Sequence, residues 1–329
     1  MATTLDIIDG GIQTTIQDYP GRFGLLARGF FPAGPMDHLA LRAGNALVGN
    51  EEGQTGLEIT LGKFRCRFAD DRTVALTGAE AKATLNGEPV EFARSLAVRA
   101  GDELRVGMAK GPGFRSYLAI SGGLDVPDVL GSRSTYTMGA LGGLEGRALK
   151  AGDAVPLGEA PDAHAAAGRR LPADAVPAYG SPWEIEAMRG PQADPDYLTP
   201  ADVELFFSRE WKVDANSNRT GLRLDRHRFD FARESGGIAG GHPSNILDDG
   251  YPVGGVNLNG DTPVILGPDG PTSGGFIVIA TIVSAGMWKI GQVRPGADAI
   301  RFREVTVEEA TDAARALAQR LHPDRLERA

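Results

Sequence analysis

A block near the C-terminal end of the chain gathers polar side chains on segments rich in glycine and proline. Residues 241–276 contain one histidine, three asparagines and four aspartates. Glycine allows positive φ and proline fixes φ, so this density predicts sharply bent loops of defined shape. Polar groups on rigid loops are what a small-molecule site needs, and we interpret the cluster, with His242 and Asn245, as a candidate site. The alternative for any one of these residues is a β-turn that joins two strands.

Two segments in the first forty residues also carry groups that suit a ligand. In residues 11–22 a glycine turn precedes Arg22, whose guanidinium can pair with Asp18 or with an anionic substrate. Residues 32–37 form a shaped loop that runs into a predicted helix at Asp37. We therefore add Asp18, Arg22 and Asp37 to the candidate binding residues.

Two later segments have similar composition. Residues 131–135 place Arg133 among hydroxyl side chains, including Ser132, which can bind an oxyanion or hydrogen-bond their own loop. Residues 216–221 contain Asn218 and Arg219 before a glycine. All four are candidate ligand contacts.

Composition narrows the class of protein. The net charge of −9 argues against nucleic acid and against an anionic membrane surface as partners. The single cysteine, Cys66, excludes an intrachain disulfide, and the five histidines never fall at metal-ligand spacing, so we expect no metal site. No signal peptide and no apolar run of membrane-spanning length is evident, which predicts a cytoplasmic protein.

Short apolar runs between frequent turns predict a mainly β protein. Predicted strands cover 63–68, 73–77, 95–99, 102–106, 115–120, 183–188, 263–266 and 276–283. Predicted helices cover 36–48 with Asp37 as N-cap, 200–207 after Thr199, and 307–321 after Thr306. A turn with glycine followed by aspartate recurs at 98–104, 149–155 and, more loosely, 293–300, and we interpret it as a common hairpin turn rather than a repeat.

The length of 329 residues favours two domains or one long β-rich unit. Residues 159–176 are rich in alanine, proline, arginine and aspartate and are predicted to be a linker or surface excursion. We therefore expect an N-terminal lobe over 1–158, a C-terminal lobe over 177–305 and a C-terminal helix over 306–329.

Several motifs taken in order resemble the allophanate hydrolase subunit 2 family of biotin-dependent carboxyltransferase-like proteins. They lie at 15–22, 34–37, 43–50, 57–58, 122–123, 131–135, 218–221, 274–275 (with Gly275) and 292–296. The resemblance implies two cyclophilin-like β-barrel lobes with a few short helices. Motifs at 242–245, 260–263, 267–271 and 288–292 resemble the second half of the carboxyltransferase domain of urea carboxylase and urea amidolyase.

That branch implies transfer of a carboxyl group from carboxybiotin to urea or a related amide or guanidino compound. Carboxybiotin would be carried on a partner protein, because the chain has no biotinylation motif, and the chain would act with a subunit 1 homologue, a biotin carboxylase and a biotin carrier. Alone it would be inactive. The alternatives are the third subunit of a bacterial 5-oxoprolinase and a non-catalytic regulatory subunit.

From this resemblance we predict that His242, Asn245 and Asp269 of the C-terminal block are the catalytic residues. Asn245 and Asp269 suit an acceptor rich in N–H donors, because asparagine accepts and donates and a carboxylate accepts. His242 suits a general acid/base, a hydrogen-bond donor or a loop anchor. No lysine or arginine lies between His242 and Phe276, which favours a urea-like acceptor over the carboxylate-bearing 5-oxoproline.

Overall fold

The computed structural model describes residues 3–321 and 323–328 of the chain. It divides into two compact units. Unit 1 comprises the described residues of Met1–Phe23, Ala33–Tyr179 and Ala318–Ala329, and unit 2 comprises Gly24–Pro32 and Gly180–Leu317. Residues 159–176 belong to unit 1, where Ala166 and Ala175 are buried, and the expected C-terminal helix spans the dividing point. His322, which the sequence places in the tail, lies outside the described residues.

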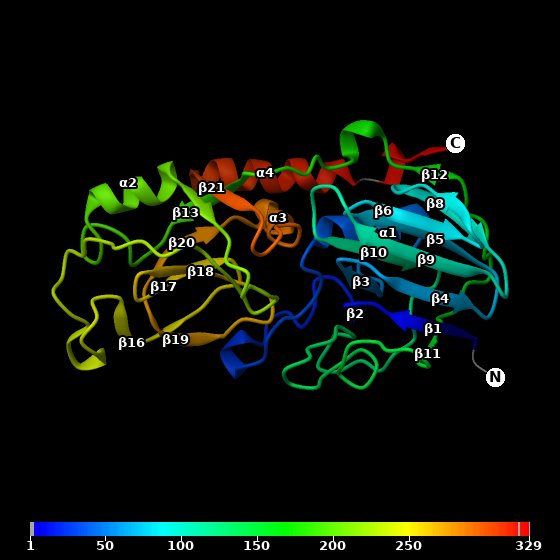
Figure 1. Cartoon of the computed structure of the whole chain (residues 1–329), viewed down its shortest axis with the longest axis horizontal. Coiled ribbons are helices and arrows are strands. Elements are labelled where there is room, and N and C mark those ends of the chain that lie inside the picture. Colours follow the sequence, from blue (N-terminus) through cyan, green and yellow to red (C-terminus); the bar gives the residue numbers. More distant parts are fainter. Residues whose placement is uncertain (1–2, 322, 329) are drawn as a thin grey trace. The chain divides into compact units, whose positions relative to one another are not determined.

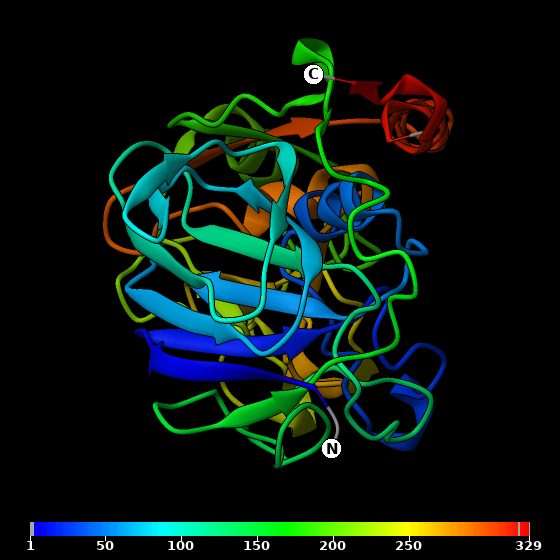
Figure 2. The ribbon, with the colours of Figure 1, turned by 90° about the vertical axis from the view of Figure 1, so that its right-hand side faces the viewer.

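Antiparallel sheets form unit 1, whose blue to cyan strands face the viewer in Figure 2. One sheet has the order β11 (Ala154–Pro156), β1 (Thr4–Gly10), β4 (Phe64–Phe68), β9 (Glu103–Ala109), β6 (Ala81–Leu85), β7 (Glu88–Val90). The other has the order β2 (Gln13–Gln17), β3 (Gly56–Thr60), β10 (Arg115–Ile120), β5 (Arg72–Gly78), β8 (Arg94–Val98), β12 (Arg169–Arg170), β22 (Glu327–Arg328).

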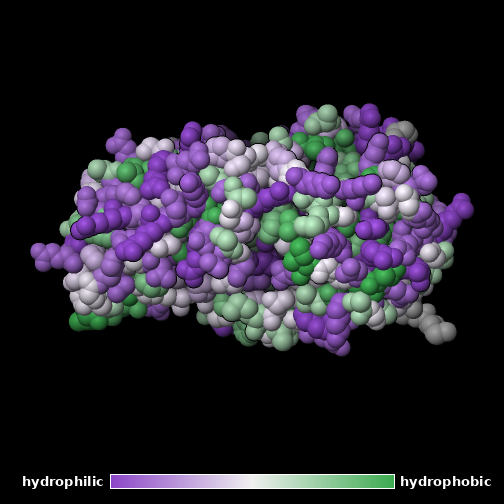
Figure 3. Space-filling model, viewed as in Figure 1, coloured by the Kyte–Doolittle hydropathy of each residue, from purple (hydrophilic) through white to green (hydrophobic). Residues whose placement is uncertain are grey.

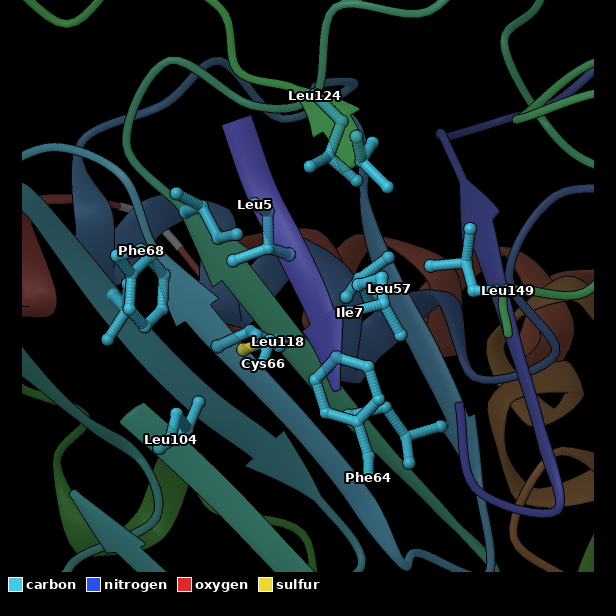
Figure 4. Close-up of a cluster of buried hydrophobic side chains, with 14 of the residues drawn as sticks. Leu5, Ile7, Leu57, Phe64, Cys66, Phe68, Leu104, Leu118, Leu124 and Leu149 are labelled. Atoms are coloured by element: carbon cyan, nitrogen blue, oxygen red, sulfur yellow. The ribbon is translucent and has the colours of Figure 1, made fainter. Parts of the chain in front are cut away.

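The apolar faces of both sheets share one core. Figure 4 shows Ile7, Phe64 and Cys66 from the first sheet directed toward Leu57 and Leu118 from the second. These side chains are almost fully removed from solvent, so hydrophobic burial at about 25 cal/mol per Å² holds the sheets together.

Helix α1 (His38–Val48) packs against β5 and β10 of unit 1. It begins where the sequence predicts, because the Asp37 carboxylate accepts a hydrogen bond from the backbone N–H of Ala40 at 2.9 Å. It ends at Gly49, whose φ of 79° is left-handed and whose N–H bonds back to Ala46.

Unit 2 is built on one mixed sheet and a short ribbon. The sheet has the order β14 (Glu210–Lys212), β21 (Ala299–Glu304), β13 (Trp183–Arg189), β20 (Val278–Ile282), β17 (Gly255–Asn259), β18 (Thr262–Leu266), β15 (Gly221–Arg223). The pair β13 and β21 is parallel, and the ribbon pairs β16 (Asn245–Gly250) with β19 (Ser273–Phe276) (Figure 1).

Aromatic stacking joins a helix to the sheet of unit 2. Helix α2 (Pro200–Ser208) begins after Thr199, as predicted, and its Phe206 stacks on Phe302 of β21 with ring centroids 4.6 Å apart. Trp211 of β14 is fully buried beside the ring of Phe206. Helix α3 (Met287–Ile290) is short, and α4 (Val307–Arg320) starts at a capping box of Thr306 and Glu309.

Single-turn 3-10 helices occupy several connections: η1 (Leu26–Arg28), η2 (Ala173–Ala175), η3 (Gly237–Ala239), η4 (Ser284–Gly286) and η5 (Pro323–Arg325).

The recurring glycine-aspartate turn is closed by a similar hydrogen bond at its three positions. The carboxylates of Asp102, Asp153 and Asp298 each accept a hydrogen bond from a backbone N–H three or four residues earlier, at 2.8, 2.9 and 2.9 Å. The preceding glycines at 101, 152 and 296 have φ of 92°, 89° and 74°, a region that favours glycine. Local turn chemistry therefore accounts for the recurrence.

The mainly β class with a few short helices is confirmed. Hydrophilic residues cover much of the face shown in Figure 3, with hydrophobic residues in scattered groups. None of the helices in the described part of the chain combines the length and the apolar composition that crossing a membrane requires.

Candidate functional site

The glycine- and proline-rich block of residues 241–276 lies in unit 2 and forms strands β16, β17, β18 and β19 with the turns between them. Many of its polar residues therefore serve strand connections. The same block also contributes half of the wall of a cavity of about 760 Å³. The cavity is lined by Leu26, Ala27, Gly29, Pro191, Asp249, Gly250, Tyr251, Pro252, Thr272, Ser273, Val278 and Thr281.

Asp249 supplies the carboxylate of this cavity, and its orientation is fixed from two sides. Its Oδ2 accepts a hydrogen bond from the side-chain amide of Gln192 at 2.5 Å, and its Oδ1 accepts from the N–H of Gly250 at 2.8 Å. Gln192 is itself held, because its Oε1 accepts from the N–H of Val278 on β20 at 2.6 Å. Among the described residues that line the cavity there is no lysine or arginine.

Tyr251 forms a second fixed wall. Its hydroxyl accepts from the N–H of Phe276 at 2.7 Å and donates to the carbonyl of the same residue at 2.9 Å. Burial raises the pKa of Tyr251 above its ordinary value. A Cβ on Gly274 would lie 2.7 Å from the Tyr251 ring, so the ring fits only over a glycine. Gly275 has a similar role, since a Cβ there would lie 3.0 Å from the carbonyl oxygen of Ile246 on β16.

His242 is held beside the ribbon by Ser244. The Ser244 N–H donates to Nδ1 of His242 at 3.1 Å and the Ser244 hydroxyl lies 2.9 Å from the same nitrogen. Nδ1 is therefore the acceptor, and a neutral ring carries its proton on Nε2, which lies 3.9 Å from an oxygen of Asp261. In this arrangement the His242 ring accepts a hydrogen bond from the backbone of Ser244 and anchors the loop before β16.

Asn245 starts β16 and contacts the preceding turn. A Cβ on Gly240 would lie 2.4 Å from its side-chain nitrogen, and its carbonyl accepts from Arg233 at 2.7 Å. Neither His242 nor Asn245 is among the residues that line the cavity.

Asp269 forms a buried ion pair with Arg219. Nε and Nη2 of Arg219 donate to the two carboxylate oxygens at 2.8 and 2.9 Å, and both side chains are less than a tenth exposed. Beside the pair, the N–H of Thr220 bonds to the side chain of the exposed Asn218 at 2.8 Å. This two-point contact between Arg219 and Asp269 holds the turn before β15 against the turn after β18.

In unit 1, the Asp18 carboxylate accepts hydrogen bonds from the loop at 132–134. It accepts from the hydroxyl of Ser132 at 2.6 Å, from the N–H of Arg133 at 2.7 Å and from the hydroxyl of Ser134 at 2.5 Å. Arg22 donates to the carbonyls of Val129 and Ser134 at 3.0 and 2.5 Å. Asp18, Arg22 and Ser132 therefore lie near one another and hold each other's loops. The side chain of Arg133 is about a third exposed.

Asp37 belongs to a buried network in unit 1 besides capping α1. Its N–H donates to the Tyr117 hydroxyl at 2.8 Å, and that hydroxyl donates to Glu58 at 2.7 Å. Burial raises the pKa of Tyr117 well above its ordinary value. Arg115 lies 3.3 Å from the other oxygen of Glu58.

The predicted site residues thus fall into separate groups within the two units. Asp249, Gln192 and Tyr251 are not among the site residues that the sequence predicted. The run Asp249-Gly250-Tyr251-Pro252 inside the block is the signal that was available. No group of three or more metal-ligating side chains occurs within residues 3–321 and 323–328.

The sequence that forms this β architecture matches a known class of transferase domain. The family model for the carboxyltransferase domain, subdomain A and B, matches residues 28–304. The chain belongs to this family.

Its relatives are parts of larger enzymes or separate subunits. The chain is 41% identical to the urea amidolyase of Lachancea kluyveri, over 93% of this chain and 17% of the relative. It is 36% identical to a 5-oxoprolinase subunit of Escherichia coli, over 94% of each. The crystal structure of the Kluyveromyces lactis urea carboxylase superposes with a TM-score of 0.92 and 37% identity, over 97% of this chain and 29% of that one. The chain therefore spans less than a fifth of the length of the Lachancea relative.

Proposed function

We propose that this chain is a carboxyltransferase subunit that moves a carboxyl group from carboxybiotin to urea or a related amide or guanidino compound. The observation that carries the proposal is the Asp249 carboxylate, fixed by Gln192 and Gly250 at the wall of the unit 2 cavity. A carboxylate accepts hydrogen bonds and so suits a substrate that presents N–H donors.

The charge of the cavity supports this class of acceptor. Its described lining contains one carboxylate and no cationic side chain. An acceptor such as 5-oxoproline brings its own carboxylate, which would face Asp249 without a counter-charge, and like charges in a cavity repel. Urea and guanidine are neutral or cationic, so they match it.

The wall of the cavity also suits the ring system of biotin. Its wall has an apolar part at Leu26, Pro191 and Pro252 and a polar part at Thr272 and Ser273. The ring system of biotin has the same two parts, a sulfur-containing apolar ring and a urea-like ring. Carboxybiotin, carried on a partner protein, supplies the carboxyl group.

The residues of this chain then position the acceptor. The acceptor nitrogen would bond to the carboxyl carbon as the bond between that carbon and the biotin nitrogen breaks, and the proton that the acceptor loses would pass to the released ureido group of biotin. Asp249 holds a second N–H of the acceptor, and the hydroxyls of Thr272 and Ser273 face its carbonyl or imino group. Such positioning in a confined site typically contributes a rate factor of about 10² or more.

The predicted catalytic residues act in this proposal through the loops that they hold. His242 and Asn245 anchor the start of β16, and Asp269 with Arg219 anchors the turn after β18. His242 and Asn245 are positioning residues for the strand that carries Asp249, and Asp269 positions the turn that leads into β19, the partner of that strand. Asp18, Arg22, Asp37, Ser132 and Gly275 shape their loops in the same sense, and the exposed Arg133 and Asn218 remain proposed contacts for carboxybiotin or its carrier.

Partners follow from the family. The relatives include a urea amidolyase of which this chain spans 17%, and a protein named as a subunit of 5-oxoprolinase. We propose that a subunit 1 homologue, a biotin carboxylase and a biotin carrier complete the enzyme, and that the chain alone turns over no acceptor.

Reconstitution tests the proposal. The chain is combined with its subunit 1 homologue and the biotin-bearing partners, and ATP-dependent carboxylation of urea, guanidine and 5-oxoproline is measured at equal concentrations. We expect urea or guanidine to be carboxylated, and Asp249→Asn to lower the rate about 10²-fold. Asp248→Asn is the matched control, because Asp248 is the exposed neighbour on the same strand.

Three results would contradict the proposal. Turnover of 5-oxoproline alone would reassign the acceptor. Equal rates for the Asp249 and Asp248 variants would remove Asp249 from the site. Complete inactivity of a stable complex with all three acceptors would favour the regulatory alternative.

A further inference from the structure

Unit 1 contains a cavity of its own, of about 460 Å³, separate from the residues discussed above for the carboxyl acceptor. Its wall is mainly apolar: Leu39 and Ala43 of α1, Phe92 before β8, and Leu171 and Val176 of the segment before β13. This volume lies in the range of small-molecule pockets, and an apolar wall of this kind binds an apolar ligand body.

The inner wall of this cavity is firmly built. The Thr77 hydroxyl donates to the carbonyl of Ala40 at 2.7 Å, which ties β5 to α1. The Tyr179 hydroxyl, which also borders the cavity, lies 3.3 Å from the Asp37 carboxylate. These polar groups are engaged with the protein, so the inner part of the cavity offers a preformed shape to a ligand.

Residues 171–179 close one side of the cavity and are held in place by contacts within unit 1. Arg325 forms an ion pair with Asp174 at 2.6 Å, and Arg320 donates to the backbone carbonyls of Asp174 and Val176 at 3.0 and 3.3 Å. These contacts hold the wall at 171–179 at several points. A ligand would therefore lose less conformational entropy of this segment on binding.

The opening carries cations. Lys82 and Lys110 border the cavity on the exposed side, with Glu80 as the acidic neighbour, so the charge of the rim is one positive. Within the described part of the chain, neither lysine forms an ion pair with an acidic side chain. In a protein whose net charge is −9, a cationic rim on an apolar cavity is a local exception.

We propose that this cavity binds a small monocarboxylate with an apolar body, such as a medium-chain acid. The chain or ring lies against Leu39, Ala43 and Val176, and the carboxylate lies at the rim beside Lys82 and Lys110. This rim carries two lysines and one glutamate, whereas the described lining of the unit 2 cavity has one carboxylate and no cationic side chain, so the ligand differs in charge from the proposed carboxyl acceptor.

Calorimetric titration of the full chain tests the inference with octanoate as the probe and neutral octanamide as the matched ligand. We expect saturable binding of octanoate, at least about 3-fold tighter than octanamide. Lys82→Ala and Lys110→Ala should each weaken octanoate about 2- to 5-fold, as for exposed ion pairs, and leave octanamide unchanged. Lys150→Ala, an exposed lysine of unit 1 away from the cavity, is the control.

Filling the cavity is the second arm. Val176→Trp should abolish binding of both ligands, and it changes a position that is 38% exposed, so unit 1 has room to fold around it. Far-UV circular dichroism checks the fold of each variant. The inference is overturned if octanoate shows no saturation at about 10 mM, beyond the millimolar range of weak sites, or if Val176→Trp binds it like the wild type.

Discussion

Replacing Asp269 tests whether the buried Arg219–Asp269 pair is structural. In Asp269→Asn the guanidinium of Arg219 loses a two-point contact at 2.8 and 2.9 Å, in a site where both side chains are less than a tenth exposed. Breaking a buried ion pair by removing the charge of one partner typically costs about 3–5 kcal/mol of stability. At an m-value of about 2 kcal/mol/M, the urea midpoint should fall by roughly 1.5–2.5 M.

Tryptophan fluorescence measures this loss of stability in unit 2, where Asp269 lies. Trp183, Trp211 and Trp288 are the three tryptophans of the chain; all belong to unit 2 and are buried. Their emission therefore follows the unfolding of unit 2, even if the chain as a whole does not unfold in two states.

Two further variants sharpen the result. Asp261→Asn removes the partner of Arg226, which is 76% exposed, and should cost no more than about 1 kcal/mol. The double variant Arg219→Met/Asp269→Leu removes both charges and should recover most of the lost stability. A midpoint shift below about 0.5 M for Asp269→Asn would refute the reasoning, since the buried charge would then be compensated by other groups.

Three other outcomes are expected. Tyr251→Phe should lower the stability of unit 2 by about 1–3 kcal/mol in the same fluorescence assay, because a backbone N–H and carbonyl of β19 lose their partner. Gly274→Ala should reduce carboxyl transfer by displacing the Tyr251 ring, whereas Gly241→Ala, with open space around the added Cβ, should keep the wild-type rate. Hydrogen bonds from Arg147 lower the pKa of Asp153, so this carboxylate stabilises unit 1 at neutral pH and loses that contribution as the pH falls below about 4; acid unfolding of Asp153→Asn should lack this component.

Local chemistry made several elements predictable. Helix α1 follows from the Asp37 cap and the apolar spacing after it, and α2 follows from Thr199 with proline at the first helical position. The recurring glycine-aspartate turn is equally local, because donor and acceptor lie three or four residues apart. Such signals need no knowledge of the distant chain.

The cavity of unit 2 was not predictable in the same way. Asp249 is oriented by Gln192, which lies 57 residues earlier, and Gln192 is fixed by Val278, which lies 86 residues later. Asp269 likewise reads as an open acceptor in the sequence, and only the fold brings Arg219 against it across 50 residues. Composition located the right block, but which of its carboxylates faces a cavity depends on these long-range contacts.

The position of Cys66 makes it a natural reporter of opening in unit 1. The thiol lies fully buried in the core shared by both sheets of unit 1, and burial raises its pKa, so the reactive thiolate is scarce in the folded state. An alkylating reagent can reach it only when these sheets separate, and the labelling rate then counts those openings. Since the tryptophans lie in unit 2, thiol labelling reports the opening of unit 1 and tryptophan emission reports the unfolding of unit 2 in the same molecule.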